Sequence, residues 1–557
     1  MPEVKVKDHI DIGQRLKADR TDLNELWEEM AEVLAPERFG FTGKGMPQHR
    51  RHENIYDTSP LIAKRGLTNS IGAMLRPKSA APGKWFDIVP EDEDLLKKPE
   101  EKKWVERVEE RLWRGLYNPR AEFIHATGEI DDDIVTFGTG TGMVTETVDG
   151  RGMLYRAFHM KNVFLEVNDL NQPVGSYIYQ EFTAKQAAIK FGEENLGEKT
   201  REALKNDREG KGTETKFMFL WVVRERYEID PRIGNNLNMP VMSLFIDIES
   251  EHLVLEEGFE EYPFFHPRWD TRSGDIYGRG PGVLALPDVL TLNQMGKTML
   301  RALHRAVDPT WLLPSDSMVT PPSMVPGDVA YYDAKAIRNL GLSDPFRQMD
   351  SRANIPWGLD AQATTREQIF SVFYKNVLNL PIDGPEMTAT EVIQRREEFV
   401  REIGAVFGRL ETDYTMPIVE TTFQMMLRRG SFGAPEDIPE SLQDTKIDFR
   451  FASPVEKAKR QIEEAGVMQG LDKVLSIGQI QPKIMTRFNW DAVGKFLAET
   501  SDFPAALTLD DKSVEEIHAQ EAAKTNAAES MQAMGEATSA IGSLPPELLK
   551  GAVPPAA

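Results

Sequence analysis

The chain has 557 residues and contains no cysteine. This absence excludes disulfides, thiolate metal sites and cysteine nucleophiles, and it leaves nine scattered histidines as the only nitrogen ligands for a metal. No run of about 18 apolar residues is present, and the first twenty residues are polar. We therefore expect no membrane span, no signal peptide and assembly in the cytoplasm.

Positive charge is also scarce. The chain has 66 lysines and arginines against 89 acidic residues, a formal net charge of −23. Phosphate binding depends on clustered basic residues, so this balance argues against a conventional nucleic-acid binder. One segment, residues 36–84, reverses the trend with nine basic residues and three acidic ones. A solvated loop or salt bridges to an acidic neighbour would explain it, and contact with a nucleic acid is the alternative.

The hydrophobic pattern predicts an α+β fold. Hydrophobic residues make up 40% of the chain, enough for sizeable cores. Residues 142–265 contain alternating β-branched and aromatic runs, which predict a β-rich middle interrupted by a helical insert at 183–208. Apolar residues at helical spacing predict helices on either side of this middle. The predicted helices include residues 14–34, 60–75, 101–117, 121–137, 287–307 and 361–378.

The longest predicted helix covers residues 388–429, far beyond the average of about 11 to 12 residues for a globular helix. Thr388 is its expected N-cap, and Glu391 completes a capping box. Pro417 should kink the helix because it lacks the N–H group, and Gly430 should end it. Such a helix would serve as a coiled-coil arm or as a strut in a large assembly.

Two glycine motifs resemble nucleotide-binding sequences without satisfying them. Gly296-Lys297-Thr298 has the end of a phosphate-binding loop, but Thr291 stands where the first glycine is needed. Gly138, Gly140 and Gly142 precede a predicted strand, whereas the dinucleotide fingerprint must open a helix. We therefore expect close helix packing at Gly296, with Lys297 facing solvent or a channel, and a helix-to-strand turn at residues 138–142.

No set of residues predicts a catalytic, cofactor-binding or metal site. His49, His52 and Glu53 lack a third nitrogen or thiolate ligand at suggestive spacing. The acidic clusters at 91–94 and 131–133 lack a partnered histidine or nucleophile, so solvated faces are expected. The chain is predicted not to be an enzyme. The alternatives are a nucleotide- or metal-dependent enzyme acting on DNA, or a scaffold protein with a coiled-coil arm that forms no ring.

Four sequence blocks resemble the portal, or head-to-tail connector, family of short-tailed bacteriophages. The blocks lie within the first 430 residues, and the last two are the more specific. They are Trp-x6-Leu-Ala-Pro at 27–36; Ile55-Tyr56-Asp57-Thr58 running on to Lys84-Trp85-Phe86; Tyr277-Gly278-Arg279-Gly280-Pro281-Gly282 with Ala285-Leu286-Pro287-Asp288; and Met387-Thr388-Ala389-Thr390-Glu391-Val392.

The resemblance implies a structural ring, usually of twelve subunits, at the capsid vertex of the virion. Double-stranded DNA would pass through its channel without sequence specificity during packaging and ejection. The implied partners are the large subunit of terminase, the major capsid and scaffolding proteins, and a tail adaptor protein. No cofactor is implied, because ATP hydrolysis would belong to the terminase motor.

The resemblance also implies a division of the chain. Residues 1–140 would form the helical part of the wing, 141–282 the β-rich wing and clip region, and 283–310 the stem helix. Residues 311–452 would return to the wing with the long helix 388–429, and residues 453–557 would form a helical crown and a low-complexity tail.

Two groups of residues are candidates for contact with DNA. Lys297, Arg301 and Arg305 lie on the predicted stem helix, although packing salt bridges are an alternative role for them. An acidic channel with sparse basic residues would let a duplex slide rather than bind tightly. The tunnel-loop candidates are Leu380, Pro381, Ile382, Asp383, Gly384, Pro385 and Glu386.

Overall fold

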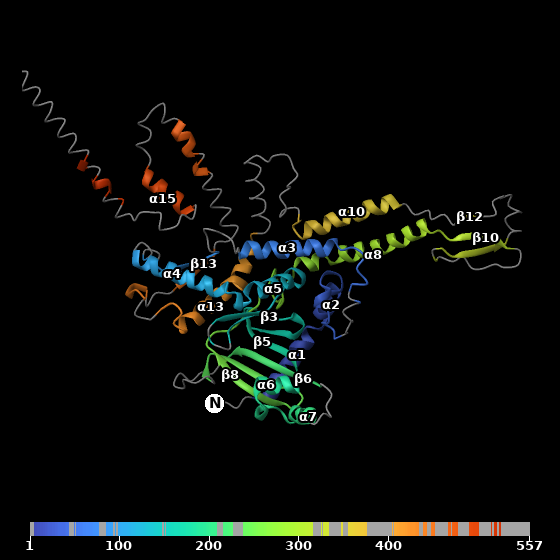
Figure 1. Cartoon of the computed structure of the whole chain (residues 1–557), viewed down its shortest axis with the longest axis horizontal. Coiled ribbons are helices and arrows are strands. Elements are labelled where there is room, and N and C mark those ends of the chain that lie inside the picture. The colour runs from blue at the N-terminus through green and yellow to red at the C-terminus, as the bar shows by residue number, and fades with distance from the viewer. Residues whose placement is uncertain are drawn as a thin grey trace, which may run out of the picture. The chain divides into compact units, whose positions relative to one another are not determined.

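Figure 1 shows the computed structural model of the chain. The described residues are 5–43, 50, 52–76, 85–92, 95, 99–147, 150, 152–208, 215–226, 238–315, 325, 327–333, 347–348, 355–375, 404, 406–433, 438–442, 447–451, 466–468, 470–476, 489–500, 514, 517–520 and 523–524. The chain forms two compact units. The first comprises Met1–Ser79, Lys84–Leu95 and Lys103–Ala458, and the second comprises Ala80–Gly83, Leu96–Lys102 and Lys459–Ala557. In the second unit the structure describes helix α15, Trp490–Thr500, and the first residues of helix α4, which continues into the first unit.

Helices and mainly antiparallel sheets occupy separate regions of the first unit, which confirms the α+β class. The helices are α1 Val6–Asp19, α2 Thr21–Leu34, α3 Ser59–Leu75, α4 Pro99–Leu116, α5 Phe123–Phe137, α6 Ala184–Phe191, α7 Glu198–Arg208, α8 Pro281–Val307, α10 Ile355–Val372 and α13 Met416–Arg428. The strands are β1 Phe86–Pro90, β2 Gly142–Glu146, β3 Met153–Ala157, β4 Val163–Val167, β5 Pro173–Thr183, β6 Lys216–Glu225, β7 Val241–Asp247, β8 His252–Phe259, β9 Phe264–Phe265, β10 Trp311–Ser315, β11 Val329–Asp333, β12 Arg347–Gln348 and β13 Ile447–Phe451.

The largest sheet has five strands in the order β4-β5-β6-β7-β8, all antiparallel. Side chains alternate between its faces, so each face has its own core. Trp221 and Phe245, paired across β6 and β7, stack with ring centroids 5.0 Å apart on the face covered by α6 and α7. Leu220 and Leu244 face the other way, in a cluster with Ile10 of α1. Figure 1 shows α1 beside this sheet. The predicted β-rich middle with its helical insert is therefore confirmed.

Three smaller sheets complete the first unit. Strand β2 pairs with β3 and β9, and β10 pairs with β11 and β12. Strands β1 and β13 pair although they are far apart in the sequence, with Phe86 opposite Phe451. The Trp85 ring stacks on Phe451 at 6.1 Å, so the aromatic residues that follow the basic segment anchor this pairing.

The single helix predicted at 14–34 is wrong, because the structure has α1 and α2 with a break at Arg20. The Arg20 side chain is 2% exposed, and its guanidinium lies 3.9 Å from the centroid of the Phe164 ring. It also donates a hydrogen bond to the backbone carbonyl of Val163 in β4. The break therefore lies where a buried arginine joins the two helices to the large sheet.

The long predicted helix is described only in its second half, and residues 388–403 lie outside the described residues. Its second half is helical and contains a π turn, Glu411–Thr415, directly before α13. The Met416 N–H bonds to Glu411 O, one residue further back than in an α-helix. Pro417 follows at once and cannot donate the next bond, so the predicted irregularity at Pro417 is a π turn. Gly430, with φ of +66°, follows the end of the helix as expected.

Candidate functional site

Helix α8 carries the predicted DNA-contacting residues and starts earlier than predicted. Gly280 is its N-cap and Pro281 occupies the first turn, whereas the prediction placed the start at Pro287. Both prolines suit a helix start, and Pro287 remains inside the helix on an exposed face. The buried face consists of Ala285, Leu286, Val289, Leu292 and Gly296.

The segment that contains Tyr56 is fixed against this helix. Asn293 on α8 accepts a hydrogen bond from Tyr56 N at 2.7 Å and donates one to Asn54 O at 2.7 Å. Tyr56 Cβ lies 3.1 Å from the position that a Cβ on Gly296 would occupy. Arg366 of α10 pairs with Asp57 at 2.7 Å. The expected close packing at Gly296 is thus present, and the segment from Asn54 to Asp57 joins α8 to α10.

The three basic candidates are four residues apart along α8, so they lie along one side of the helix. Lys297 is half-buried, and its Nζ is 5.5 Å from the centroid of the Tyr56 ring. Arg301 and Arg305 are exposed. Within the described part of the chain, no ion pair joins any of the three to an acidic residue. The alternative role in packing salt bridges is therefore not seen there.

The tunnel-loop candidates, Leu380 to Glu386, lie outside the described residues, as does His49 of the histidine pair. The structure therefore leaves both predictions as they stand. Among the residues it does describe, no group of three or more histidine, aspartate and glutamate side chains is arranged to hold a metal ion.

The glycine-rich segment at 138–142 meets the glycine-rich segment at 278–282 at the end of α5. Gly138 caps this helix with φ of +88°, so a helix-to-strand turn is confirmed at residues 138–142. A Cβ on Gly138 would lie 2.4 Å from Gly280 N and 2.5 Å from Gly278 O. A Cβ on Gly282 would lie 2.3 Å from Thr136 O. These glycines allow the chain entering α8 to cross the end of α5 backbone to backbone.

The acidic cluster at 131–133 is not a solvated face as predicted, because Asp131 and Asp133 are 2% and 1% exposed. Its partners come from the basic segment. Arg38 pairs with Asp133 at 3.0 Å, Lys64 pairs with Asp132 at 2.9 Å, and Arg76 pairs with Asp131. Three basic residues of the 36–84 segment therefore form ion pairs with an acidic neighbour, which is one of the three interpretations first given for that segment.

Burial affects the protonation of this cluster. It raises the pKa of Asp133 to about 7, although Arg38 acts in the opposite direction. His159 lies near Arg38, and burial followed by the positive charge of Arg38 lowers its pKa to about 3. The histidine is therefore neutral, while Asp133 can change its charge near neutral pH.

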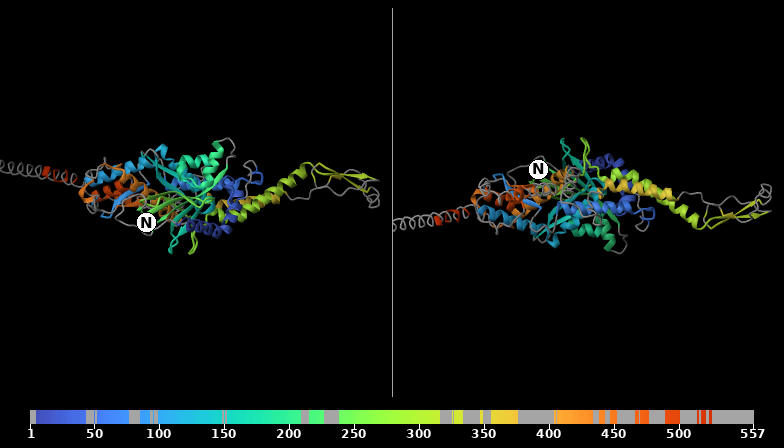
Figure 2. Two further views of the ribbon diagram at one scale, coloured as in Figure 1. Left: turned by 90° about the horizontal axis from the view of Figure 1, so that it is seen from below. Right: turned by 90° about the horizontal axis from the view of Figure 1, so that it is seen from above.

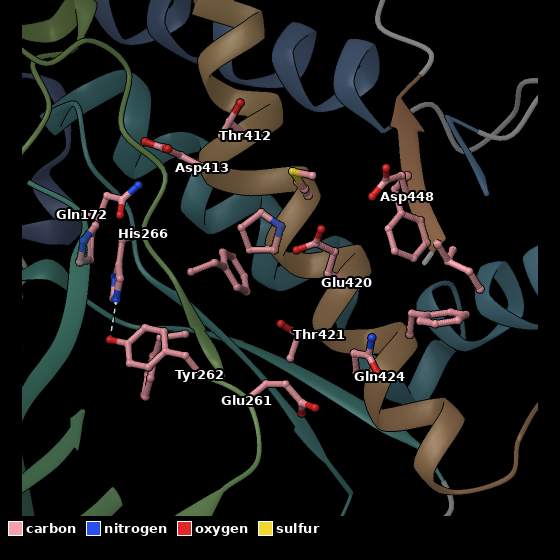
Figure 3. Close-up of a pocket in the computed structure, with 18 of the residues that line it drawn as sticks. Gln172, Glu261, Tyr262, His266, Thr412, Asp413, Glu420, Thr421, Gln424 and Asp448 are labelled. Atoms are coloured by element: carbon pink, nitrogen blue, oxygen red, sulfur yellow. Dashed lines mark hydrogen bonds between the residues drawn. The ribbon is translucent and has the colours of Figure 1, made fainter. Parts of the chain in front are cut away.

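A cleft of about 980 Å³ lies between the π turn, α13, β13 and the residues around β9 (Figure 3). Its carboxylates include Glu261, Asp413, Glu420 and Asp448, and Arg268 pairs with Asp413 at 3.1 Å. Figure 3 shows the four carboxylates around a mixed polar and apolar hollow, with His266 and Tyr262 at one end. The sequence does not predict this cleft, because its lining comes from distant segments that share no motif.

The histidine beside this cleft belongs to a buried hydrogen-bond network. His266 Nε2 lies 3.0 Å from Ser176 Oγ and 3.2 Å from the Tyr262 hydroxyl, and its Nδ1 lies 3.0 Å from Thr141 Oγ1. A serine and a histidine at this distance are the geometry of a nucleophile and a base. However, Ser176 is fully buried. The partner of the other imidazole nitrogen, Nδ1, is the Thr141 hydroxyl and not a carboxylate. Burial also lowers the pKa of His266 to about 3, so the network is structural.

Comparison with known proteins identifies the family. The family model for the bacteriophage head to tail connecting protein matches residues 7–508, and the chain belongs to this family. The chain is similar to the portal protein of Salmonella phage epsilon15, with 24% identity over 535 residues that cover 94% of this chain and 92% of the relative. It is also 24% identical to the probable portal protein of Bordetella phage BPP-1 over 523 residues, 92% of this chain and 91% of the relative.

A solved chain from the virion of a native gene transfer agent particle aligns with 78% of this chain and 89% of its own length. Its sequence identity is 11% and its TM-score is 0.32, too low to establish a shared fold. The family match confirms the predicted function, a structural portal at the capsid vertex that connects head to tail. A portal is a component of the virion, as predicted. None of the helices in the described ranges is long and apolar enough to cross a membrane.

Proposed function

We propose that this chain forms a closed ring, of twelve copies as in the family pattern, around a channel for double-stranded DNA. Helix α8 would be the stem helix beside the channel, with Arg301 and Arg305 reaching the phosphates and Lys297 held against Tyr56. The exposed basic side of α8, on a chain of net charge −23, supports this proposal. A few basic side chains on an otherwise acidic protein can guide a DNA duplex without binding it tightly.

The remaining parts of the proposal follow the division predicted from the sequence. Residues 1–140 and 311–452 form the wing, 141–282 the wing and clip, 283–310 the stem and 453–557 the crown and tail. Residues 380–386 form a tunnel loop that touches DNA. The ring docks the large terminase subunit, the capsid and scaffolding proteins and the tail adaptor, and it assembles in the host cytoplasm. The protomer itself catalyses no reaction.

Charge reversal of the α8 arginines tests the DNA contact. The double variant Arg301→Glu and Arg305→Glu should still form rings but should change the length of nuclease-protected DNA in particles packaged in vitro. Arg120→Glu is the matched control, because Arg120 is an exposed arginine in the 3-10 turn Pro119–Ala121 and is not part of α8. We expect it to package DNA of normal length.

Two results would contradict parts of this proposal. Normal packaging by the double variant would show that the α8 arginines do not contact DNA in the channel. Loss of rings would show that they lie in an interface between protomers. ATP hydrolysis or DNA cleavage by the purified protein would contradict its non-catalytic role.

A further inference from the structure

The cleft beside α13 runs along one edge of strand β13. Three successive residues of this strand, Ile447, Asp448 and Phe449, line the cleft. Successive side chains of a strand point to opposite faces, so a cleft lined by all three follows the edge of the strand. Figure 3 shows β13, with Asp448, beside the part of α13 that carries Glu420.

The backbone groups of Ile447 and Phe449 are directed away from the partner strand β1. In the antiparallel pair, Ile88 of β1 lies opposite Phe449. The Ile88 N–H donates to the Glu109 carboxylate at 2.8 Å, so Ile88 and Phe449 do not form a hydrogen-bonded pair. The ladder bonds to β1 therefore come from the alternate residues of β13. Among the described residues β13 pairs with β1 alone, which leaves the N–H and C=O groups of Ile447 and Phe449 at an open edge.

A buried donor and a buried acceptor at this cleft lack partners. Helix α4 carries Trp104 and lies beside α13, as Figures 1 and 2 both show. Trp104 lines the cleft and is 4% exposed, and its Nε1 has no hydrogen-bond partner within the described ranges. Glu261 Oε2 is buried without a partner there too, whereas Oε1 pairs with Arg428. A peptide supplies both an acceptor and a donor, whereas a metal ion can accept no hydrogen bond from Trp104.

The charge of the lining selects a basic peptide. Leu427 and Phe449 provide apolar surface, and Leu427 is 37% exposed. The tail of the chain, residues 512–557, has three lysines and six glutamates, and the whole chain has a net charge of −23. A basic segment of another protein therefore complements the cleft better than this tail or a second copy does. The described lining has one arginine, Arg268, and the carboxylates Glu225, Glu261, Asp413, Glu420 and Asp448.

We propose that the cleft binds an extended, lysine- or arginine-bearing segment of another protein, which adds as a strand to the open edge of β13. Its backbone bonds to Ile447 and Phe449, and one of its carbonyl groups accepts from Trp104 Nε1. Its cationic side chains lie against Glu420 and the neighbouring carboxylates. The proposal goes beyond the ring and its channel, and it holds or fails whatever number of copies assembles.

Peptide binding to the full-length protomer tests the proposal. The probe is a fluorescent peptide of about ten residues in which lysine and valine alternate. A lysine–glycine peptide of the same length and charge is its control, because glycine disfavours a strand. We expect the lysine–valine peptide to bind at least about tenfold more tightly in fluorescence anisotropy, since only it is predisposed to extend along β13. Equal affinities, or no binding of the lysine–valine peptide, would overturn the proposal.

Two substitutions at one position test the contact with the strand edge. Ile447→Pro removes the N–H at the open edge and leaves the ladder bonds between β13 and β1, because Ile447 is the first residue of the strand. Ile447→Ala shortens the side chain and keeps the N–H. We expect the proline variant to bind the lysine–valine peptide at least about tenfold more weakly than the alanine variant, at matching melting temperatures. Equal binding by the two variants would exclude the edge of β13.

The acidic wall is tested by removing one charge. Glu420→Gln should weaken binding of the lysine–valine peptide at least about threefold. Glu202→Gln is the matched control and should change it less than about twofold, because Glu202 is exposed on α7 and does not line the cleft. The same loss in both variants would mean that the peptide responds to the net charge of the protein and not to this cleft.

Hydrogen exchange distinguishes another protein from a segment of this chain. The amides of Ile447 and Phe449 should exchange quickly in the free protomer and slowly with the lysine–valine peptide bound. Slow exchange before the peptide is added would overturn the proposal, because the chain itself would then cover the edge of β13.

Discussion

The guanidinium of Arg76 forms a buried ion pair with the carboxylate of Asp131, and the ring of Tyr414 lies 4.7 Å from the same guanidinium. Arg76 follows α3, Asp131 lies in α5, and Tyr414 lies in the π turn before α13. The Tyr414 hydroxyl also donates to Thr127 O on α5 at 3.1 Å. This contact therefore joins three segments that are distant in the sequence, including the described half of the long helix.

Removing one partner of this pair should destabilise the protomer strongly. We expect Asp131→Ala to lower the free energy of unfolding by about 3–5 kcal/mol, because it leaves the Arg76 charge buried without a counter-charge. The double variant Arg76→Met and Asp131→Leu should lose less, since it buries no charge. Urea denaturation of the protomers measures both values. If Asp131→Ala lost no more unfolding free energy than the double variant, Arg76 and Asp131 would not form an ionised pair in the folded protein.

The stability of the protomer should depend on the protonation of Asp133. An aspartate has a pKa of about 3.9 when unfolded, whereas burial raises the folded value to about 7. Between these values the folded state holds a proton that the unfolded state has released. The contribution of Asp133 to stability therefore falls as pH rises through this window, and it is constant above the folded pKa.

Asp133→Asn removes this titration. From about pH 5.5 to about pH 8.5, the variant should gain about 2 kcal/mol of unfolding free energy relative to the natural protein. Paired urea titrations at the two pH values measure this change, and the other titrating groups cancel in the comparison. If the difference in unfolding free energy between the variant and the natural protein were the same at both pH values, Asp133 would stay ionised throughout. The effect of Arg38 on the pKa of Asp133 would then outweigh that of burial.

Gly138 should not tolerate any side chain. Gly138→Ala forces a Cβ against backbone atoms of residues 278 to 280, and φ of +88° adds strain. We expect a loss of more than about 3 kcal/mol in unfolding free energy, or failure to fold. Gly128→Ala is the matched control in the same helix, because a Cβ there meets no atom within 4 Å. The control should gain up to about 1 kcal/mol, and equal effects would disprove the close crossing.

The Ser176–His266 contact should matter for stability and not for packaging. Ser176→Ala removes one partner of His266 Nε2 and leaves the Tyr262 hydroxyl within 3.2 Å. We expect a loss of about 1 kcal/mol in unfolding free energy. The amount of nuclease-protected DNA per particle should equal that of the natural protein. Loss of packaged DNA at unchanged stability would instead support a chemical role for the serine.

Periodicity predicted the local elements well. Alternating runs predicted β2 to β8, and helical spacing predicted a helix at 60–75, where α3 spans Ser59–Leu75. These features depend on residues that are close together in the sequence, so they can be predicted from the sequence alone.

Features that depend on contacts between distant segments could not be predicted from local sequence patterns. The break at Arg20 requires the carbonyl of Val163, and the burial of Asp131 and Asp133 requires Arg76 and Arg38 from other segments. The cleft beside α13 is lined by residues from separate parts of the chain. The basic positions on α8 could be named from helical spacing, but the half-burial of Lys297 against the Tyr56 ring depends on tertiary structure.

The mass and shape of the purified protein under assembly conditions test the central claim most directly. Mass photometry combined with negative-stain microscopy should show rings with a central hole and a mass near twelve times the 62.9 kDa of one chain. A single species of 62.9 kDa without rings under those conditions would contradict the account.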